Sequence, residues 1–144
     1  NAVIPGMIRF ENSLGGRVAI TAFNLYGNMS STVFNYRKKE IVRQTIEWLG
    51  KESLPFYVRT SPNIYCIFNR SKVANKAIST LINLCSDPAP EIELSLSEEW
   101  NGCQVSILDT NGDWQNLQLT VNNGQVTISE ELKFMEPVYL KFTY

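Results

Sequence analysis

The sequence contains no histidine. Histidine is the commonest general base of enzymes and the commonest nitrogen ligand of metals, so Ser-His-Asp and Cys-His catalytic arrangements are excluded. No serine is followed three positions later by lysine, which also excludes the Ser-x-x-Lys hydrolase motif. Any catalysis by this chain would depend on carboxylates, thiols or lysines alone.

Phosphate-binding patterns and a large net charge are also absent. The eight glycines form no Gly-x-Gly-x-x-Gly pattern, and Gly50-Lys51 follows a predicted helix instead of preceding one. The formal net charge of -1 provides no long-range field for nucleic acid or an anionic membrane. No apolar run approaches the roughly 20 residues that span a bilayer. We therefore expect no cofactor, no nucleic acid and no membrane partner.

The three cysteines, Cys66, Cys85 and Cys103, form an odd set without Cys-x-x-Cys spacing. Zinc sites need closely spaced ligands, so these residues are interpreted as small core residues. The compartment remains open. In a periplasmic or extracellular protein one pair could oxidise.

The first third of the chain predicts a β-hairpin followed by one amphipathic helix. β-rich runs at 7–10 and 17–23 flank the turn formers at 12–16. One helical face is formed by Ile41, Val42, Thr45, Ile46, Trp48 and Leu49. Gly50 would supply a left-handed stop to a helix at about 36–49. The basic residues at 37–39 would oppose the helix dipole, which favours a start nearer Ser30 or Ser31.

From Leu54 onward the apolar period changes to two, which predicts strands. The runs at 64–68 and 78–84 are apolar on both sides and are expected to meet little solvent on either side, whereas 91–97 alternates with polar residues. Asn111-Gly112 and Asn123-Gly124 indicate hairpin turns. We expect an antiparallel immunoglobulin-like β-sandwich over 51–144, separate from residues 1–50. Its inward residues should include Val105, Ile107, Leu117, Leu119, Val126 and Ile128.

Candidate sites are few. Trp100 and Trp114 lie near strand ends, where an exposed ring could stack on a sugar. Asp109, Asn111 and Asp113 resemble the front of a calcium loop, although the bidentate glutamate of such loops is missing and the turn alone explains Asn-Gly. Two adjacent carboxylate pairs could in principle serve a glycosidase, but they have the pattern of solvated surface residues. These pairs are Glu98-Glu99 and Glu130-Glu131.

Several segments resemble the C-terminal portion of bacterial β-galactosidase-like glycoside hydrolases. They are the runs 9–19, with its Glu-Asn-x-Leu-Gly-Gly-Arg-Val stretch, 45–49, 54–58 and 81–88. The resemblance implies that residues 1–50 are the tail of a glutamine-amidotransferase-like α/β domain and that the rest is a terminal β-sandwich. It implies no catalytic carboxylate in this region. Asn1-Ala2 before Val3 also resembles the remnant of a removed expression tag, so we expect further domains of the same polypeptide upstream.

These observations favour a non-catalytic accessory domain of a carbohydrate-active enzyme, which packs against its own enzyme or supports oligomerisation. A carbohydrate-binding module that uses Trp100 or Trp114 to bind an oligosaccharide is the first alternative. A carboxylate-based glycoside hydrolase is the second. Because the stripe at 41–49 is wide and two strands alone are marginal in water, we also expect an exposed apolar patch and self-association.

Overall fold

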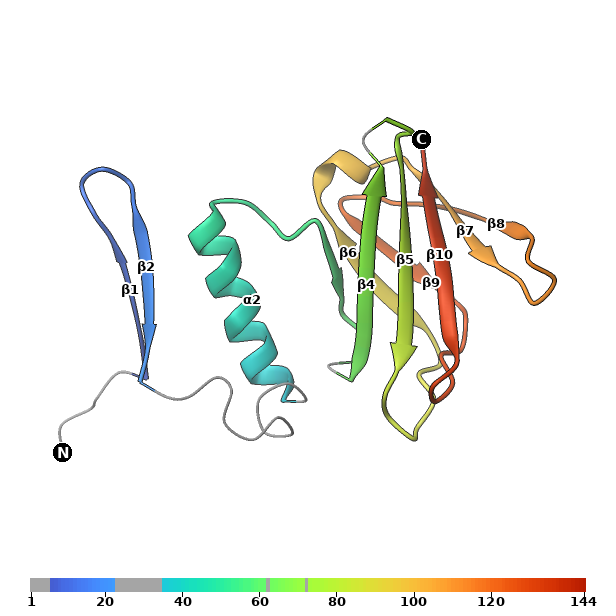
Figure 1. Ribbon diagram of the computed structural model, residues 1–144, viewed down its shortest axis with the longest axis horizontal. Helices are drawn as coiled ribbons and strands as arrows, with labels where there is room; N and C mark the ends of the chain where they lie inside the picture. Colours follow the sequence, from blue (N-terminus) through green and yellow to red (C-terminus); the bar gives the residue numbers. More distant parts are fainter. Residues whose placement is uncertain (1–5, 23–34, 62, 72) are drawn as a thin grey trace. The chain divides into compact units, whose positions relative to one another are not determined.

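The computed structural model describes residues 6–22, 35–61, 63–71 and 73–144 (Figure 1). The predicted tag remnant before Val3, and Ser30 and Ser31, lie outside the described residues. The chain forms two compact units, Asn1–Leu54 and Pro55–Tyr144. The sequence predicts this boundary at residue 50, and the two units meet four residues later, after Leu54.

The first unit contains the predicted hairpin. Strands β1 (Met7–Glu11) and β2 (Arg17–Thr21) pair in antiparallel register. The Asn12 side chain closes their turn by accepting the backbone N–H groups of Leu14 at 3.0 Å and Gly16 at 2.8 Å. Local polar residues therefore set this turn, as the Asn/Gly-rich sequence predicts.

Helix α2 (Tyr36–Gly50) follows in the same unit. Its bounds agree with the helix predicted at about 36–49, but this helix does not start nearer Ser30 or Ser31, because Asn35 is the N-cap and its side chain accepts the backbone N–H groups of Arg37 and Lys38. This cap satisfies the first turn in spite of its basic residues. At the other end the left-handed residue is Lys51, with φ 60°, and not Gly50; the backbone N–H of Lys51 donates to Glu47.

The helix meets the hairpin through polar contacts as well as packing. Arg9 Nη2 donates to Thr45 Oγ1 at 2.9 Å, and Arg17 donates to the Trp48 carbonyl. Both guanidinium groups lie over the Trp48 ring, at 5.9 and 5.1 Å from its centroid. Trp48 is thus half-buried under two arginines instead of forming part of a purely apolar interface.

The second unit is the predicted mainly β sandwich, with two antiparallel sheets (Figure 1). The five-stranded sheet has the order β4-β5-β10-β7-β8, and the three-stranded sheet has the order β3-β6-β9. The strands are β3 (Phe56–Val58), β4 (Ile64–Ser71), β5 (Lys76–Asn83), β6 (Ile92–Leu96), β7 (Gln104–Leu108), β8 (Trp114–Thr120), β9 (Gln125–Ile128) and β10 (Pro137–Thr143).

The core between the two sheets follows the predicted register. Val105, Val126 and Ile128 are buried, and the other three predicted inward residues, Ile107, Leu117 and Leu119, are partly buried against the core. An aromatic cluster fills the centre and comprises Phe56, Phe68, Trp100 and Phe142. Asn123-Gly124 forms the expected turn, with φ of 51° and 67°.

Candidate functional site

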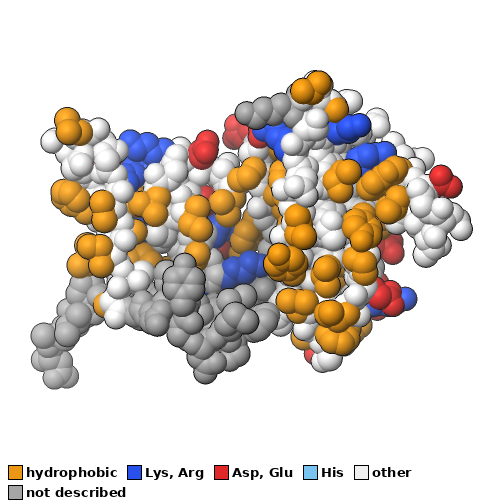
Figure 2. All heavy atoms as spheres, in the orientation of Figure 1, with side chains coloured by type: hydrophobic (Ala, Val, Ile, Leu, Met, Phe, Trp, Pro, Cys, Tyr) orange, Lys and Arg blue, Asp and Glu red, His pale blue; other side chains and the backbone are white. Residues whose placement is uncertain are grey.

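The five-stranded sheet has an unusual outer face, meaning the side that points away from the core. Antiparallel sheets normally present polar residues to solvent. Here Tyr65 is 54% exposed and Ile67 43%, while Ile78 is 39% and Tyr139 37% exposed. Figure 2 shows hydrophobic side chains gathered over β4, β5 and β10. The runs at 64–68 and 78–84 therefore contact the core on one side only, which corrects the expectation of little solvent on either side.

The three-stranded sheet presents polar residues on its outer side, as antiparallel sheets usually do. The outward residues of β6 and β9 are polar, and they include Glu93, Gln125 and Thr127. The hollow on this side, of about 180 Å³, has both Arg59 and Glu93 in its lining, so its charges are balanced. The apolar outer face is therefore specific to the five-stranded sheet.

The two ends of the outer face differ in the polarity of their side chains. Its Tyr65 end is apolar, whereas its other end presents Lys76 on β5 and Lys141 on β10. The register pairs Lys76 with Thr143 and Lys141 with Ile78, so the two lysines are diagonal neighbours. Such diagonal neighbours lie about 7–8 Å apart, with their Cβ atoms somewhat closer. Within the described residues neither lysine forms an ion pair with a carboxylate.

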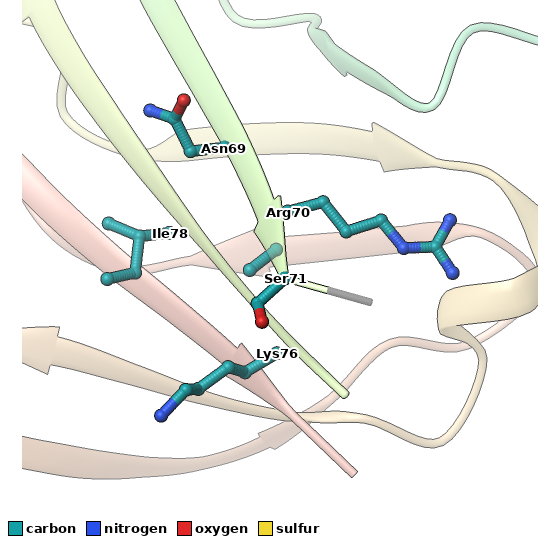
Figure 3. A pocket seen from close by; sticks show the side chains of 6 residues that line it. Asn69, Arg70, Ser71, Lys76 and Ile78 are labelled. Atoms are coloured by element: carbon teal, nitrogen blue, oxygen red, sulfur yellow. The ribbon is translucent and has the colours of Figure 1, made fainter. Parts of the chain in front are cut away.

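A hollow of about 210 Å³ lies at this lysine end of the outer face, beside the β4–β5 turn (Figure 3). Its lining comprises Asn69, Arg70, Ser71, Lys76, Ala77 and Ile78. Figure 3 shows Arg70 pointing away from Lys76. Arg70 pairs with Glu99 at 2.7 Å and lies 5.3 Å from the Trp100 ring centroid. Among the described residues that line the hollow, Lys76 is therefore the cation that can bind a ligand.

The two tryptophans have different surroundings. Trp100 is 1% exposed and contacts Phe68, Phe142 and Tyr144, with ring centroids 6.0, 6.5 and 5.7 Å away. Its ring is therefore not available for stacking on a sugar, in contrast to the prediction. Trp114 is half-buried at the edge strand β8, and the Lys141 ammonium lies 4.6 Å from its ring centroid.

The loop that resembles a calcium site is a hydrogen-bonded turn. Asp109 Oδ1 accepts the backbone N–H groups of Asn111 and Asp113, both at 2.9 Å, and Oδ2 accepts Gln115 Nε2 at 2.9 Å. The Asp113 N–H, followed by the Gln115 amide, lowers the pKa of Asp109 below its usual value. No group of three or more potential metal ligands occurs within the described residues. The turn accounts for these residue types without a cation.

The carboxylate pairs lie on the surface. Glu98, Glu130 and Glu131 are exposed, and Glu99 pairs with Arg70. The described residues that line the hollow beside the β4–β5 turn include no carboxylate. These positions give no converging pair that could work across a glycosidic bond.

The three cysteines, all of them described residues, form no disulfide; Cys103 is buried, and Cys66 and Cys85 are partly buried. Burial raises the pKa of Cys103 to about 11.

Among the helices that the structure describes, none is long and apolar enough to cross a membrane.

Sequence reasoning missed the lysine end of the outer face. Lys76 and Lys141 are 65 positions apart in the sequence (141 - 76), and only the pairing of β5 with β10 makes them neighbours. A signal was available in the composition, because the five strands of this sheet contain no Asp or Glu at all.

Comparison with known proteins shows similarity in structure but not in sequence. No family model and no curated protein matches the chain. A solved structure, α-L-fucosidase isoenzyme 2 from Paenibacillus thiaminolyticus, matches with a TM-score of 0.62 and 15% sequence identity. The match covers 97% of this chain and 22% of the fucosidase chain. The chain therefore shares its fold with a segment that is less than a quarter of that larger protein.

Proposed function

We propose that this chain is a non-catalytic accessory domain of a glycoside hydrolase. The observation that supports this most directly is the coverage of the structural match, 97% of this chain against 22% of the fucosidase chain. Hairpin, helix and sandwich together have a counterpart inside a larger glycosidase. The sequence resemblance to the C-terminal portion of β-galactosidase-like enzymes supports the same role, and in the proposal the domain packs against its own polypeptide or supports oligomerisation.

The exposed apolar surface of the hairpin supports a packing role. Ile8 and Ile20 form one cross-strand pair and Phe10 and Val18 the next, and all four point to the same side. Their exposed fractions are 53, 62, 61 and 51%. We call this surface the hairpin outer side. A two-stranded hairpin is marginal in water, so such a surface favours contact with further protein.

The apolar end of the sandwich outer face supports the same role. Tyr65 lies beside Ile82 in the register, and Ile82 lies beside Pro137. These residues have no polar side chain between them, unlike the outward residues of β6 and β9. In the proposal this end packs against another domain of the enzyme. The surface positions of the paired glutamates favour the accessory role over a carboxylate-based hydrolase.

The test compares the natural polypeptide that contains this sequence with a version that lacks it. We expect the natural polypeptide to hydrolyse an aryl α-L-fucoside or β-D-galactoside. We expect the purified 144-residue chain to hydrolyse neither. Removing the domain should lower the melting temperature or the oligomeric mass.

Two results would contradict the proposal. One is a natural polypeptide without glycosidase activity towards a panel of aryl glycosides. The other is turnover by the 144-residue chain that disappears in Glu98→Gln or Glu130→Gln. The second result would favour the carboxylate-based hydrolase instead.

A further inference from the structure

We propose that the lysine end of the outer face binds an acidic saccharide. In this site the carboxylate or sulfate of the sugar lies between Lys76 and Lys141, and the sugar ring packs on Ile78 and Tyr139. The inference does not depend on the accessory role, because it concerns a ligand of this chain and not its position in an enzyme.

Charge distribution is the first argument. The chain contains 14 acidic residues, yet the five strands of this sheet contain none. Lys76 and Lys141 are diagonal neighbours across β5 and β10, and neither pairs with a described carboxylate. Two ammonium groups on a face whose strands carry no acidic residue attract an anionic ligand, which would accept charge-assisted hydrogen bonds from them.

The position of Lys141 is the second argument. Its ammonium lies 4.6 Å from the centroid of the Trp114 ring. This cation–π contact limits the freedom of a side chain that would otherwise be mobile. A ligand that binds Lys141 therefore meets a cation that is already held on the outer face. In this arrangement Trp114 positions Lys141, and it is not itself the stacking platform that the sequence suggested.

Apolar contact area beside the lysines is the third argument. Ile78 lies directly opposite Lys141, and Tyr139 lies two residues from Lys141 on the same side of β10. Their side chains are 39 and 37% exposed. A small inorganic anion would use only the charges, whereas a pyranose ring has an apolar face that can pack on Ile78 and Tyr139. The combination favours a sugar acid over a simple anion.

The hollow beside Ile78 gives the ring substituents a place to bind (Figure 3). Asn69 and Ser71 line it together with Lys76, within a volume of about 210 Å³. An amide and a hydroxyl can donate to and accept from sugar hydroxyls. Ligand sites commonly combine apolar contacts with a few polar groups that fix orientation, and this hollow has both.

The experiment measures binding by calorimetry at low ionic strength with the 144-residue chain. The probes are an oligogalacturonate, a chondroitin sulfate oligosaccharide, a neutral galacto-oligosaccharide of equal length, and polyphosphate. We expect binding to at least one acidic oligosaccharide and none to the neutral one. Lys76→Ala combined with Lys141→Ala should weaken it about tenfold or more, as expected for charge-assisted contacts.

Two further variants separate a site from general charge attraction. Lys38→Ala combined with Lys133→Ala removes the same net charge away from the sheet and should leave the affinity within about twofold. Tyr139→Ala should weaken binding of the acidic oligosaccharide several-fold and leave polyphosphate binding unchanged. Circular dichroism and the melting temperature of each variant show whether it is folded.

The proposal is overturned if no acidic saccharide binds at millimolar concentration, or if both double variants weaken binding equally. It is also overturned if polyphosphate binds as tightly and Tyr139→Ala changes nothing, since the site would then recognise charge alone. Self-association of the unliganded chain that Ile78→Asp abolishes would identify this end as a protein interface instead.

Discussion

The buried side-chain amide of Asn83 donates a hydrogen bond to the backbone carbonyl of Leu132, which lies 49 positions later, at 3.0 Å. The same amide donates to the Asp87 carbonyl at 2.9 Å, and the side-chain oxygen accepts the Cys85 N–H at 2.9 Å. One side chain, 1% exposed, thus joins the end of β5 to the segment before β10.

We predict that Asn83→Ala destabilises the chain by about 2–4 kcal/mol, because it removes the three hydrogen bonds of a buried side chain, to the carbonyls of Asp87 and Leu132 and from the Cys85 N–H. Urea unfolding followed by tryptophan fluorescence measures the change. Asn69→Ala is the matched control, since Asn69 is exposed on the neighbouring strand, and it should stay within about 0.5 kcal/mol of the parent. Equal effects of the two substitutions would show that the Asn83 hydrogen bonds do not stabilise the fold.

A second prediction concerns the turn between β8 and β9. Gly124 has φ +67°, and a Cβ there would lie 2.6 Å from the backbone oxygen of Leu96. Gly112 has φ +89° but open space around the Cβ position. Gly112→Ala should cost about 1–2 kcal/mol for the backbone conformation alone. Gly124→Ala should cost more, because the Leu96 backbone must also move.

Thermal unfolding of the two alanine variants tests this difference. Both glycines occupy Asn-Gly pairs and both have positive φ, so the comparison isolates the steric contact. A Gly112→Ala variant as unstable as Gly124→Ala would mean that backbone conformation, and not the approach of Leu96, determines the cost.

The sequence predicted the strands well because the alternation of apolar residues is a local property. Ile92, Leu94 and Leu96 alternate with polar residues, and all three are buried. Asn123-Gly124 likewise gave the correct turn, since both residues readily adopt φ > 0. Asn111-Gly112 also lies in a hairpin turn, which joins β7 to β8. Its conformation differs from the expected one, because the Asp109 side chain organises the turn and, of the pair, Gly112 alone has positive φ.

The surface features were harder to predict because they depend on pairings between distant strands. Periodicity could not distinguish a strand buried on both sides from β4, whose outward Tyr65 and Ile67 are exposed. Trp100 was expected at the surface because it follows a strand end. It is buried because the short helix η1 (Glu98–Trp100) turns its ring into the aromatic core.

A third prediction follows from the thiols. Burial raises the pKa of Cys103 from its ordinary value of 9.0 to about 11. At pH 8 iodoacetamide should therefore modify Cys66 and Cys85, which are partly buried, well before Cys103. Mass spectrometry of digests taken over time measures the order. Modification of Cys103 at the rate of the other two in folded protein would contradict its burial.

The raised pKa of Cys103 also determines the direction in which folding stability changes with pH. The folded state retains the Cys103 proton where the unfolded state loses it, so this contribution to stability is complete below about pH 9. It should decline as the pH rises from about 9 to about 11. Cys103→Ala should remove this pH-dependent part of the free energy of unfolding. Urea unfolding of the parent and the variant at pH 8 and pH 10 measures the difference.

A fourth prediction concerns Asp109. Backbone N–H groups, chiefly that of Asp113, lower the pKa of Asp109 in the folded state. The contribution of this carboxylate to folding stability is therefore present above the unfolded pKa, and it is lost as the pH falls through the folded pKa. Asp109→Ala should reduce the difference between the melting temperatures at pH 6 and pH 3. Calcium should not change the melting temperature of the parent chain, because both carboxylate oxygens already accept hydrogen bonds. A calcium-dependent rise that Asp109→Ala abolishes would restore the cation loop.

The last prediction concerns the hairpin outer side. In the isolated chain we expect weak self-association through this surface, because it is apolar and has no charge that would repel a second copy. Four side chains are fewer than a stable interface of about 800 Å² per partner requires, so the association should be concentration-dependent. Light scattering should show an apparent mass that rises above 16.4 kDa as the concentration increases.

Two variants with threonine in place of aliphatic residues locate the contact. Val18→Thr combined with Ile20→Thr keeps β-branched residues in β2 and adds two hydroxyl groups to the hairpin outer side. It should return the mass to that of a monomer at all concentrations. Ile67→Thr makes the same kind of change on the outer face of the sandwich and should leave the association unchanged. Loss of association in Ile67→Thr alone would place the contact on the sandwich, and a parent chain that stays monomeric throughout would mean that the hairpin outer side is stable in water.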